Sequence, residues 1–205
     1  MSIISSYSQI IFPENSAFNK TNQRQQLRQF IRKQRSALSI QQQLDAEQKI
    51  IAPVLEFLHT RPVKNIAIYL SFDGELSTKA LIQTLWQQGY HLYLPVLHPF
   101  SDGNLLFLAY TPDTPLRKNK FSISEPKLDV TQVLPANQLD IIFTPLVAFD
   151  QQKNRLGMGG GFYDRTLENW QQKNFLPIGL AHQCQQVSEI PCEAWDIPLF
   201  DIFAV

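Results

Sequence analysis

The chain has 205 residues, which is enough for one hydrophobic core and marginal for two domains. Hydrophobic residues make up 44% of it and the formal net charge is +0, so the composition is globular and argues against broad binding to nucleic acid or an anionic membrane. No apolar run reaches the roughly 18 residues of a membrane span. The two cysteines, Cys184 and Cys192, fit neither a zinc pattern nor a disulfide framework. We therefore expect a reduced, cytoplasmic protein, and no feature indicates a protein partner.

The first segment, residues 1–22, is rich in Ser, Asn and Gln. It lacks the basic start and the long apolar centre of a secretory signal. We expect a loosely ordered extension there, followed by a single domain over residues 23–205.

A helix is predicted over residues 21–38. Its Arg24, Arg28 and Arg32 are spaced i, i+4, i+8 and share one face. Like charges at this spacing repel one another unless something anionic lies against them. The row therefore indicates either a solvated basic face or a contact with a polyphosphate.

A second helix follows. Ser39 and Gln42 form a capping-box pattern at its start, and Pro53 predicts a kink or a split inside it. Residues 65–71 are then rich in strand formers, and this predicted strand ends at a turn over residues 72–75.

The next helix is capped by Ser77 or Thr78 and ended by Gly89, and a strand is predicted over residues 90–97. A strand–helix–strand unit of this kind predicts parallel pairing of its two strands.

The second half of the chain is richer in strand patterns. We expect strands over residues 104–110, 139–149 and 177–181, an edge strand over 200–205, and a helix over 163–172. Residues 111–120 read as an exposed connection and 121–126 as a short extended segment. The whole pattern predicts an α/β protein, a three-layer sandwich with a mostly parallel sheet and N-terminal helices.

The segment from Arg155 to Arg165 holds half of the eight glycines of the chain. Glycines between a strand and a helix let backbone N–H groups surround a phosphate, and the helix start adds unpaired donors. Arg155 offers a fixed cation that we expect to stabilise a transferring phosphate, and Asp164 offers an oxygen ligand for magnesium. The spacing matches neither the Walker pattern nor the dinucleotide pattern, and a plain turn is the alternative interpretation.

Three further residues are candidates for the site. Glu75 follows a strand and a glycine, at the edge where open parallel sheets bind ligands, although a carboxylate there also favours a helix start. His182 ends a late strand, where a structural role is the simpler interpretation. Asp196 follows Trp195 in a loop and is either an ordinary turn residue or, with Asp164, a second ligand of one magnesium ion.

Several segments, in order, resemble one family, that of 5-formyltetrahydrofolate cyclo-ligase, also called methenyltetrahydrofolate synthetase. The resemblance runs from about Gln23 to the C-terminus. The matching segments are Leu27-Arg28, Arg35 to Ser39, Tyr69 to Thr78, Leu94-Pro95, Glu125-Pro126, Pro145 to Asp150 and Arg155 to Asp164.

The resemblance implies a Rossmann-like α/β sandwich and the ATP-dependent closure of 5-formyltetrahydrofolate to 5,10-methenyltetrahydrofolate, with release of ADP and phosphate. It implies magnesium as the cofactor, held by Asp164 and Asp196. The residues that match ATP contacts are Arg24, Gln25, Gln26, Leu27, Arg28, Arg155, Leu156, Gly157, Met158, Gly159, Gly160, Gly161, Phe162 and Tyr163. The residues that match folate contacts are Leu70, Glu75, Met158, Gly159, Gly160, Gly161 and Phe162.

The chain departs from the family pattern at a few positions. Gly160 stands where many relatives have a lysine, so the cation that faces the transferred phosphate is left open. Lys153, Trp195 and Phe162 replace a frequent glycine, histidine and tyrosine. Two other functions stay open: a sugar-phosphate isomerase or coenzyme A transferase-like enzyme, which needs no ATP, and a nucleotide- or folate-binding module without catalysis.

Overall fold

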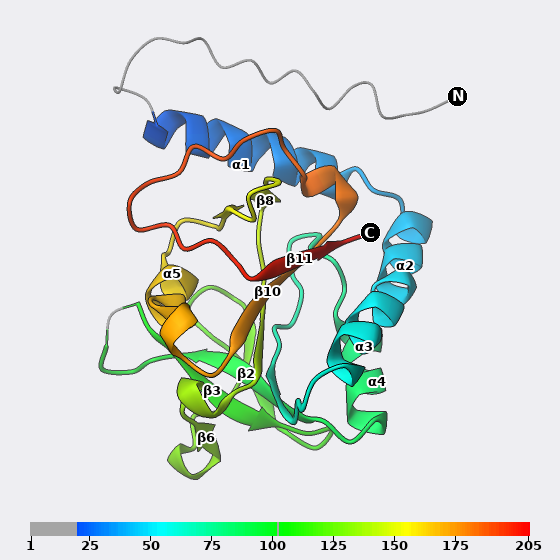
Figure 1. The fold of residues 1–205 in the computed structure, drawn as a ribbon, viewed down its shortest axis with the longest axis vertical. Coiled ribbons are helices and arrows are strands. Elements are labelled where there is room, and N and C mark those ends of the chain that lie inside the picture. The colour runs from blue at the N-terminus through cyan, green and yellow to red at the C-terminus, as the bar shows by residue number, and fades with distance from the viewer. Residues whose placement is uncertain (1–19, 102) are drawn as a thin grey trace.

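A computed structural model describes residues 20–101 and 103–205 (Figure 1). Its centre is a seven-stranded sheet in the order β11-β10-β7-β1-β2-β3-β6. The strands are β1 (Asn65–Ala67), β2 (His91–Leu97), β3 (Leu105–Tyr110), β6 (Val133–Leu134), β7 (Ile141–Thr144), β10 (Leu176–Ala181) and β11 (Asp201–Ala204). Neighbours from β11 to β2 pair in parallel, and β3 and β6 add antiparallel pairs at the other edge. The predicted mostly parallel sheet and the edge strand at the C-terminal end are confirmed.

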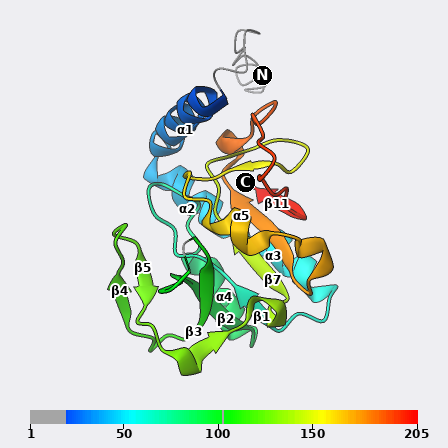
Figure 2. The same cartoon turned by 90° about the vertical axis from the view of Figure 1, so that its left-hand side faces the viewer.

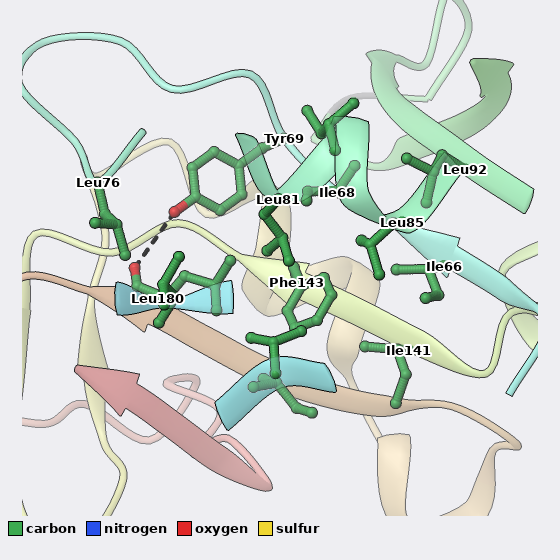
Figure 3. Close-up of a cluster of buried hydrophobic side chains, with 14 of the residues drawn as sticks. Ile66, Ile68, Tyr69, Leu76, Leu81, Leu85, Leu92, Ile141, Phe143 and Leu180 are labelled. Atoms are coloured by element: carbon green, nitrogen blue, oxygen red, sulfur yellow. Dashed lines mark hydrogen bonds between the residues drawn. The ribbon is translucent and has the colours of Figure 1, made fainter. Parts of the chain in front are cut away.

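Helices cover both faces of the sheet, as the sandwich prediction requires. One face packs against α2 (Ile40–Lys49), α3 (Ile51–His59) and α4 (Lys79–Gln87), and Figure 3 shows part of the buried cluster between them. The other face packs against the short α5 (Phe162–Leu167) and the 3-10 turn Trp170–Gln172. Ile66 faces the first cluster and Ala67 the second, because successive strand side chains point to opposite faces.

Local signals explain several helix ends. Ser39 and Gln42 form the predicted capping box, and the helix splits at Ile50, because Pro53 lacks an N–H and crowds the carbonyl four residues before it. Gly89 ends α4 with a φ of 82°. Thr78 is the N-cap residue of α4, but its hydroxyl donates to the carbonyl of Tyr69 at 2.7 Å instead of capping the helix.

Helix α1 (Lys20–Ser36) lies outside the two main layers, above β8 (Ala148–Phe149) (Figure 1). It begins at Lys20, so residues 20–22, which we expected in the extension, belong to the helix. Residues 1–19 lie outside the described residues.

The predicted strand over residues 139–149 is wrong as a single element. β7 ends at Thr144, because Pro145 cannot donate to a sheet ladder, and the chain then turns back. β8 pairs antiparallel with β9 (Arg155–Leu156), so a small hairpin, and not the buried strand itself, leads into the glycine loop. The predicted helix over 163–172 is also too long: α5 ends at Leu167, and Asn169 follows in a left-handed conformation with a φ of 55°.

Residues 111–120 are mostly exposed, as predicted, but they are not only a connection. β4 (Leu116–Lys118) pairs antiparallel with β5 (Ser124–Pro126), and this hairpin stands out from one side of the molecule (Figure 2). No helix over residues 20–101 and 103–205 is long and apolar enough to cross a membrane.

Candidate active site

A cavity of about 720 Å³ opens at the carboxyl ends of β1, β2 and β7. This volume is typical of small-molecule sites, and in open α/β sheets ligands bind at this edge. Its inner wall is mostly apolar and is formed by Tyr69, Leu70, Leu94, Pro95, Leu97, Pro145 and Leu146. Its other end is polar and is formed by Arg24, Arg28, Arg155, Asp164, Glu193 and the loop over residues 157–161. The cavity thus has one end suited to a flat organic ring and one suited to an anion.

The glycine loop forms the anion end and lies against α1. Gly159 and Gly161 have φ values of 100° and 66°, which residues with a Cβ rarely adopt. Nε of Arg28 donates to the carbonyl of Gly157 at 2.8 Å. The guanidinium carbon of Arg28 lies 3.7 Å from the position of a Cβ on Gly159. The loop therefore presents backbone donors beside a cation.

The packing of α1 fixes this cation in place. Leu27 and Ile31 are buried in a separate small cluster with Val147, Ala148 and Leu156 of the β8–β9 region. Arg28 follows Leu27 directly, so the packing of the apolar face of α1 against the β8–β9 region also holds Arg28 over the loop.

Arg155 lines the cavity from below the loop. Only 3% of it is exposed, and its Nη2 donates to Oδ1 of Asp164 at 2.7 Å. Its Nε is buried without a hydrogen-bond partner among the described residues. Arg155 thus places in the cavity wall a guanidinium that Asp164 holds in position, and such a group suits an anion.

The other arginines of α1 do not form an unpaired row. Arg24 makes a bidentate ion pair with Asp196, from a position 172 residues away in the sequence. Arg32 pairs with Asp73, with Nε 2.8 Å from Oδ2. The expectation of uncompensated repulsion along this helix face is therefore wrong, because Asp196 and Asp73 come from distant loops and neutralise both ends of the row.

Glu75 is the carboxyl group at the apolar end of the cavity. It is 8% exposed, and its Oε2 accepts from the N–H of Phe72 at 3.2 Å. Burial is the main cause that raises the pKa of Glu75 from 4.5 to about 7, and the Phe72 N–H and Arg35 act against it. The carboxyl group therefore titrates near neutral pH.

His182 lies apart from the residues that line the cavity. It is buried, its side chain accepts from the N–H of Gln185, and Gln185 bonds back to the N–H of His182. Burial lowers the pKa of His182 to about 4, so the ring is neutral at pH 7. Its structural role at the end of β10 agrees with the simpler interpretation.

Most of the predicted site residues meet in the cavity. The ones that line it are Arg24, Arg28, Leu70, Glu75, Arg155, Gly157, Met158, Gly159, Gly160, Gly161, Phe162, Tyr163 and Asp164. The ones outside its described lining are Gln25, Gln26, Leu27, Leu156 and Asp196. Gln25 and Gln26 are exposed, Leu27 and Leu156 are buried in the small cluster under α1, and Asp196 holds Arg24.

Sequence reasoning missed the aromatic rim of the cavity. Phe72, Phe121 and Trp195 line it and are 38%, 50% and 65% exposed. Phe121 comes from the tip of the β4–β5 hairpin, and its ring lies edge-on to Phe162 of the glycine loop, 6.0 Å between centroids. The signal that could have revealed this rim is the presence of large aromatic residues in segments predicted to be exposed loops.

The fit of magnesium rests on Asp164 and Asp196. Within the described ranges, no group of three or more His, Cys, Asp or Glu side chains gathers as a metal cluster. Magnesium needs only one or two carboxylates when phosphates supply other ligands. Asp164 bonds Arg155 through Oδ1, whereas both oxygens of Asp196 are engaged by Arg24 and by the N–H of Glu193. Asp164 can offer its second carboxylate oxygen, Oδ2, to the ion. Asp196 can bind the ion only if its ion pair with Arg24 opens.

Together, the sheet and the two-ended cavity define an α/β enzyme that brings a phosphate-bearing ligand against a ring-shaped substrate. The profile of the 5-formyltetrahydrofolate cyclo-ligase family matches residues 20–205. The 5-formyltetrahydrofolate cyclo-ligase of Haemophilus influenzae is 63% identical over 182 residues, which cover 89% of this chain and 97% of the relative. That of Escherichia coli K12 is 53% identical over 169 residues, 82% of this chain and 93% of the relative.

Solved structures agree with these relatives. The 5,10-methenyltetrahydrofolate synthetase of Aquifex aeolicus superposes with a TM-score of 0.75 at 26% identity, over 88% of this chain and 89% of that one. The 5,10-methenyltetrahydrofolate synthetase of Mycoplasma pneumoniae superposes with a TM-score of 0.69 at 26% identity, over 87% and 96% of the two chains. The chain therefore belongs to the 5-formyltetrahydrofolate cyclo-ligase family.

Proposed function

We propose that this chain catalyses the ATP-dependent cyclisation of 5-formyltetrahydrofolate to 5,10-methenyltetrahydrofolate, with release of ADP and phosphate. The observation that carries the proposal is the single cavity with an anion-binding end and an apolar end, because this reaction must place a terminal phosphate next to a substituted ring.

The chemistry needs positioning and charge neutralisation more than it needs an acid or a base. The formyl oxygen attacks the terminal phosphorus of ATP, a new P–O bond forms, and the bond to ADP breaks. The second folate nitrogen then attacks the activated carbon and loses its proton, and phosphate leaves with the former formyl oxygen. Phosphorylation turns a poor leaving group into a good one, and the protein stabilises the charge that moves.

Arg155 and Arg28 are the proposed cations for the transferred phosphate. Both face the cavity around the glycine loop. Residue 160 does not supply this charge, because it is a glycine and has no side chain. The ring of Phe162 occupies the space that a side chain would need, since a Cβ added at Gly160 would lie 2.7 Å from that ring. Arg28 already lies over the loop, so we assign it the positive charge that Gly160 does not supply.

Glu75 is the proposed anchor of the folate ring. As a carboxylate it accepts hydrogen bonds from the adjacent N–H donors of a pterin edge, and the apolar wall that includes Leu70 covers the rest of the ring. Its place beside this apolar wall suits the binding of a ring.

Asp164 is the proposed carboxylate ligand of a magnesium ion that accompanies ATP. The ion would neutralise phosphate charge and hold the phosphates in line for transfer. Asp196 is retained as a second candidate ligand, and in the state described here it holds Arg24. A reduced, cytosolic setting suits the two cysteines, which are both free thiols.

The direct test is the near-ultraviolet absorbance of the methenyl product. The rise in absorbance must require 5-formyltetrahydrofolate, ATP and magnesium together, and ADP must form in equal amount. Arg155→Ala is expected to lower turnover by about two orders of magnitude or more, the scale of one preorganised electrostatic contact. Arg61→Ala, an exposed arginine that bonds within its own helix region, serves as the control. Product formation without ATP would overturn the proposal.

A further inference from the structure

The turn that carries Glu75 has a constrained backbone. Asp73 and Gly74 follow one another in the left-handed region, with φ values of 53° and 72°. The N–H of Glu75 donates to the carbonyl of Phe72 at 3.0 Å, and the carboxylate of Glu75 accepts from the N–H of Phe72. Aspartate enters the left-handed region more readily than most residues with a side chain, and its surroundings help to hold it there.

Arg35, near the end of α1, supplies that constraint. It is 0% exposed, and its Nη2 donates both to the carbonyl of Asp73 at 2.6 Å and to Oδ2 of Asp73 at 2.8 Å. Its Cγ and its carbonyl oxygen each lie 3.7 Å from the position of a Cβ on Gly74. One buried side chain therefore holds the backbone and the side chain of the turn at once.

Arg35 keeps unused hydrogen-bonding capacity beside this turn. Arg32 and Arg35 share the single carboxylate of Asp73, but Arg32 is 44% exposed, so solvent screens its charge. Nε and Nη1 of Arg35 are buried, and within residues 20–101 and 103–205 they have no hydrogen-bond partner. The buried cation of the cluster is therefore Arg35, and its charge favours the ionised form of Glu75.

The other titratable groups near Glu75 and Arg35 are neutral at pH 7: the phenols of Tyr69 and Tyr163 near Glu75, and His182, whose pKa is about 4, and the Cys184 thiol, whose pKa burial raises, near Arg35. Tyr69 at the end of β1 and Tyr163 of α5 both have a raised pKa, because burial and the neighbouring Glu75 disfavour their ionised forms. Asp73 raises the pKa of Glu75 further, and Arg35 lowers it. Arg35 is thus the cation that opposes the effect of burial on this carboxyl group.

We propose that Arg35 is a positioning residue, which fixes the left-handed turn through Asp73 and supplies the buried positive charge that lets Glu75 bind the folate ring as a carboxylate. The proposal rests on the proposed function and deepens it, because it names what sets the folate affinity of the site. Arg35 does not itself line the cavity within the described residues.

The test is the pH dependence of 5-formyltetrahydrofolate binding, measured by calorimetry from pH 6 to 9. Affinity should rise with pH as Glu75 ionises. The midpoint is the pH at which half of this rise in affinity has occurred. In Arg35→Gln it should move upward by about one pH unit or more, because a nearby opposite charge shifts a pKa by about that much. Folate affinity at pH 7 should then fall about fivefold or more and recover at high pH, while ATP affinity stays within about twofold. Arg35→Lys should restore part of the shift.

Two further variants separate charge from structure. Arg32→Gln removes the exposed partner of the same carboxylate and should move the midpoint much less, since solvent screens that charge. Asp73→Asn tolerates the left-handed turn and removes a negative charge, so its midpoint should move downward, opposite to Arg35→Gln. If Arg35→Gln does not fold, the double variant Arg35→Gln/Asp73→Asn, which removes the pair together, decides the matter: its midpoint should lie above that of Asp73→Asn alone.

An unmoved midpoint in Arg35→Gln, or in the double variant relative to Asp73→Asn, in a chain that still forms product, refutes the role of Arg35 alone. Equal losses of folate and ATP affinity at every pH in Arg35→Gln would also refute it, because that pattern indicates general loosening. Failure of the unmodified chain to form methenyltetrahydrofolate refutes the proposed function and this inference with it.

Discussion

Glu75 shows how a single buried carboxyl group links function to stability. Its pKa is about 7 in the folded chain and 4.5 in an ordinary environment, so between these values the folded state keeps a proton that the unfolded state has lost. The stability that this proton confers is present below pH 4.5 and is lost as pH rises through 7. The full loss amounts to roughly 3 kcal/mol, at 1.36 kcal/mol per pKa unit.

Glu75→Gln should therefore stabilise the protein at pH 8 and leave its stability at pH 4 almost unchanged. The expected gain at pH 8 is up to about 3 kcal/mol in the free energy of unfolding, measured by urea denaturation. The same variant should bind 5-formyltetrahydrofolate more weakly while ATP binding stays near normal. A gain over the wild type that is the same at pH 4 and at pH 8 would contradict the burial of an ionised Glu75.

Asp164 and Asp196 should respond differently to removal of their charge. Asp164→Asn should raise the magnesium concentration that half-maximal activity requires, because it loses a metal ligand. Asp196→Asn should raise the Michaelis constant for ATP at saturating magnesium, because Arg24 loses its bidentate partner. Magnesium titrations at fixed ATP measure the first effect. A raised magnesium requirement in both variants would assign both carboxylates to the metal.

At the scale of elements, α1 is the part of the fold that nucleotide binding should protect. Arg24 and Arg28 face the cavity from this helix, and Arg28 bonds the glycine loop. Hydrogen exchange over residues 20–36 should slow when ATP and magnesium saturate the site. Mass action gives about 2.7 kcal/mol of added protection at a hundredfold excess over the dissociation constant, if α1 opens only in the free state. Exchange over α3 serves as the internal control, and equal slowing there would indicate global stabilisation instead.

Local chemistry made some elements predictable. Three helix features depend only on neighbouring residues: the capping box at Ser39, the split of the helix before Pro53 and the helix end at Gly89. The glycine loop was predictable because its positive φ values favour glycine. The return of the chain after Pro145 into a hairpin was not visible, because an apolar run does not reveal where pairing changes direction. The short α5 was missed because Asn169 looks neutral in a helical pattern.

The candidate site divides in the same way. The loop residues and Arg155 are adjacent in sequence and were predictable as a unit. The carboxylates that neutralise the arginines of α1 lie far away in the sequence and could not be predicted. Arg24 meets Asp196 across 172 residues and Arg35 meets Asp73 across 38, so only the tertiary fold decides which charges are paired. Glu75 could be placed at the ligand edge of the sheet, but its depth of burial could not.

At the scale of the whole molecule, two buried groups give the stability opposite dependences on pH. Glu75 destabilises the fold as pH rises from 4.5 to 7. His182, whose pKa falls from 6.5 to about 4, destabilises it as pH falls through that window, because the unfolded state then binds a proton that the folded state refuses. The two slopes oppose each other between pH 4.5 and 6.5.

The free energy of unfolding should therefore be nearly flat from about pH 5 to 6.5. Urea denaturation across this range measures it. In Glu75→Gln the opposing slope is gone, so stability should rise steadily with pH over the same interval. A wild-type curve that already rises steeply there would show that one of the two groups does not titrate as described.

Helix α1 also spans both ends of the cavity. Midway along it Arg28 bonds the glycine loop, and near its end Arg35 bonds the turn of Glu75. A ligand that steadies this helix from one end leaves less motion to be lost when the second ligand arrives, which is heterotropic cooperativity without a change of shape. We expect a non-hydrolysable ATP analogue to raise the affinity for 5-formyltetrahydrofolate several-fold, and calorimetry in the reverse order must return the same factor, because linkage between two sites is reciprocal.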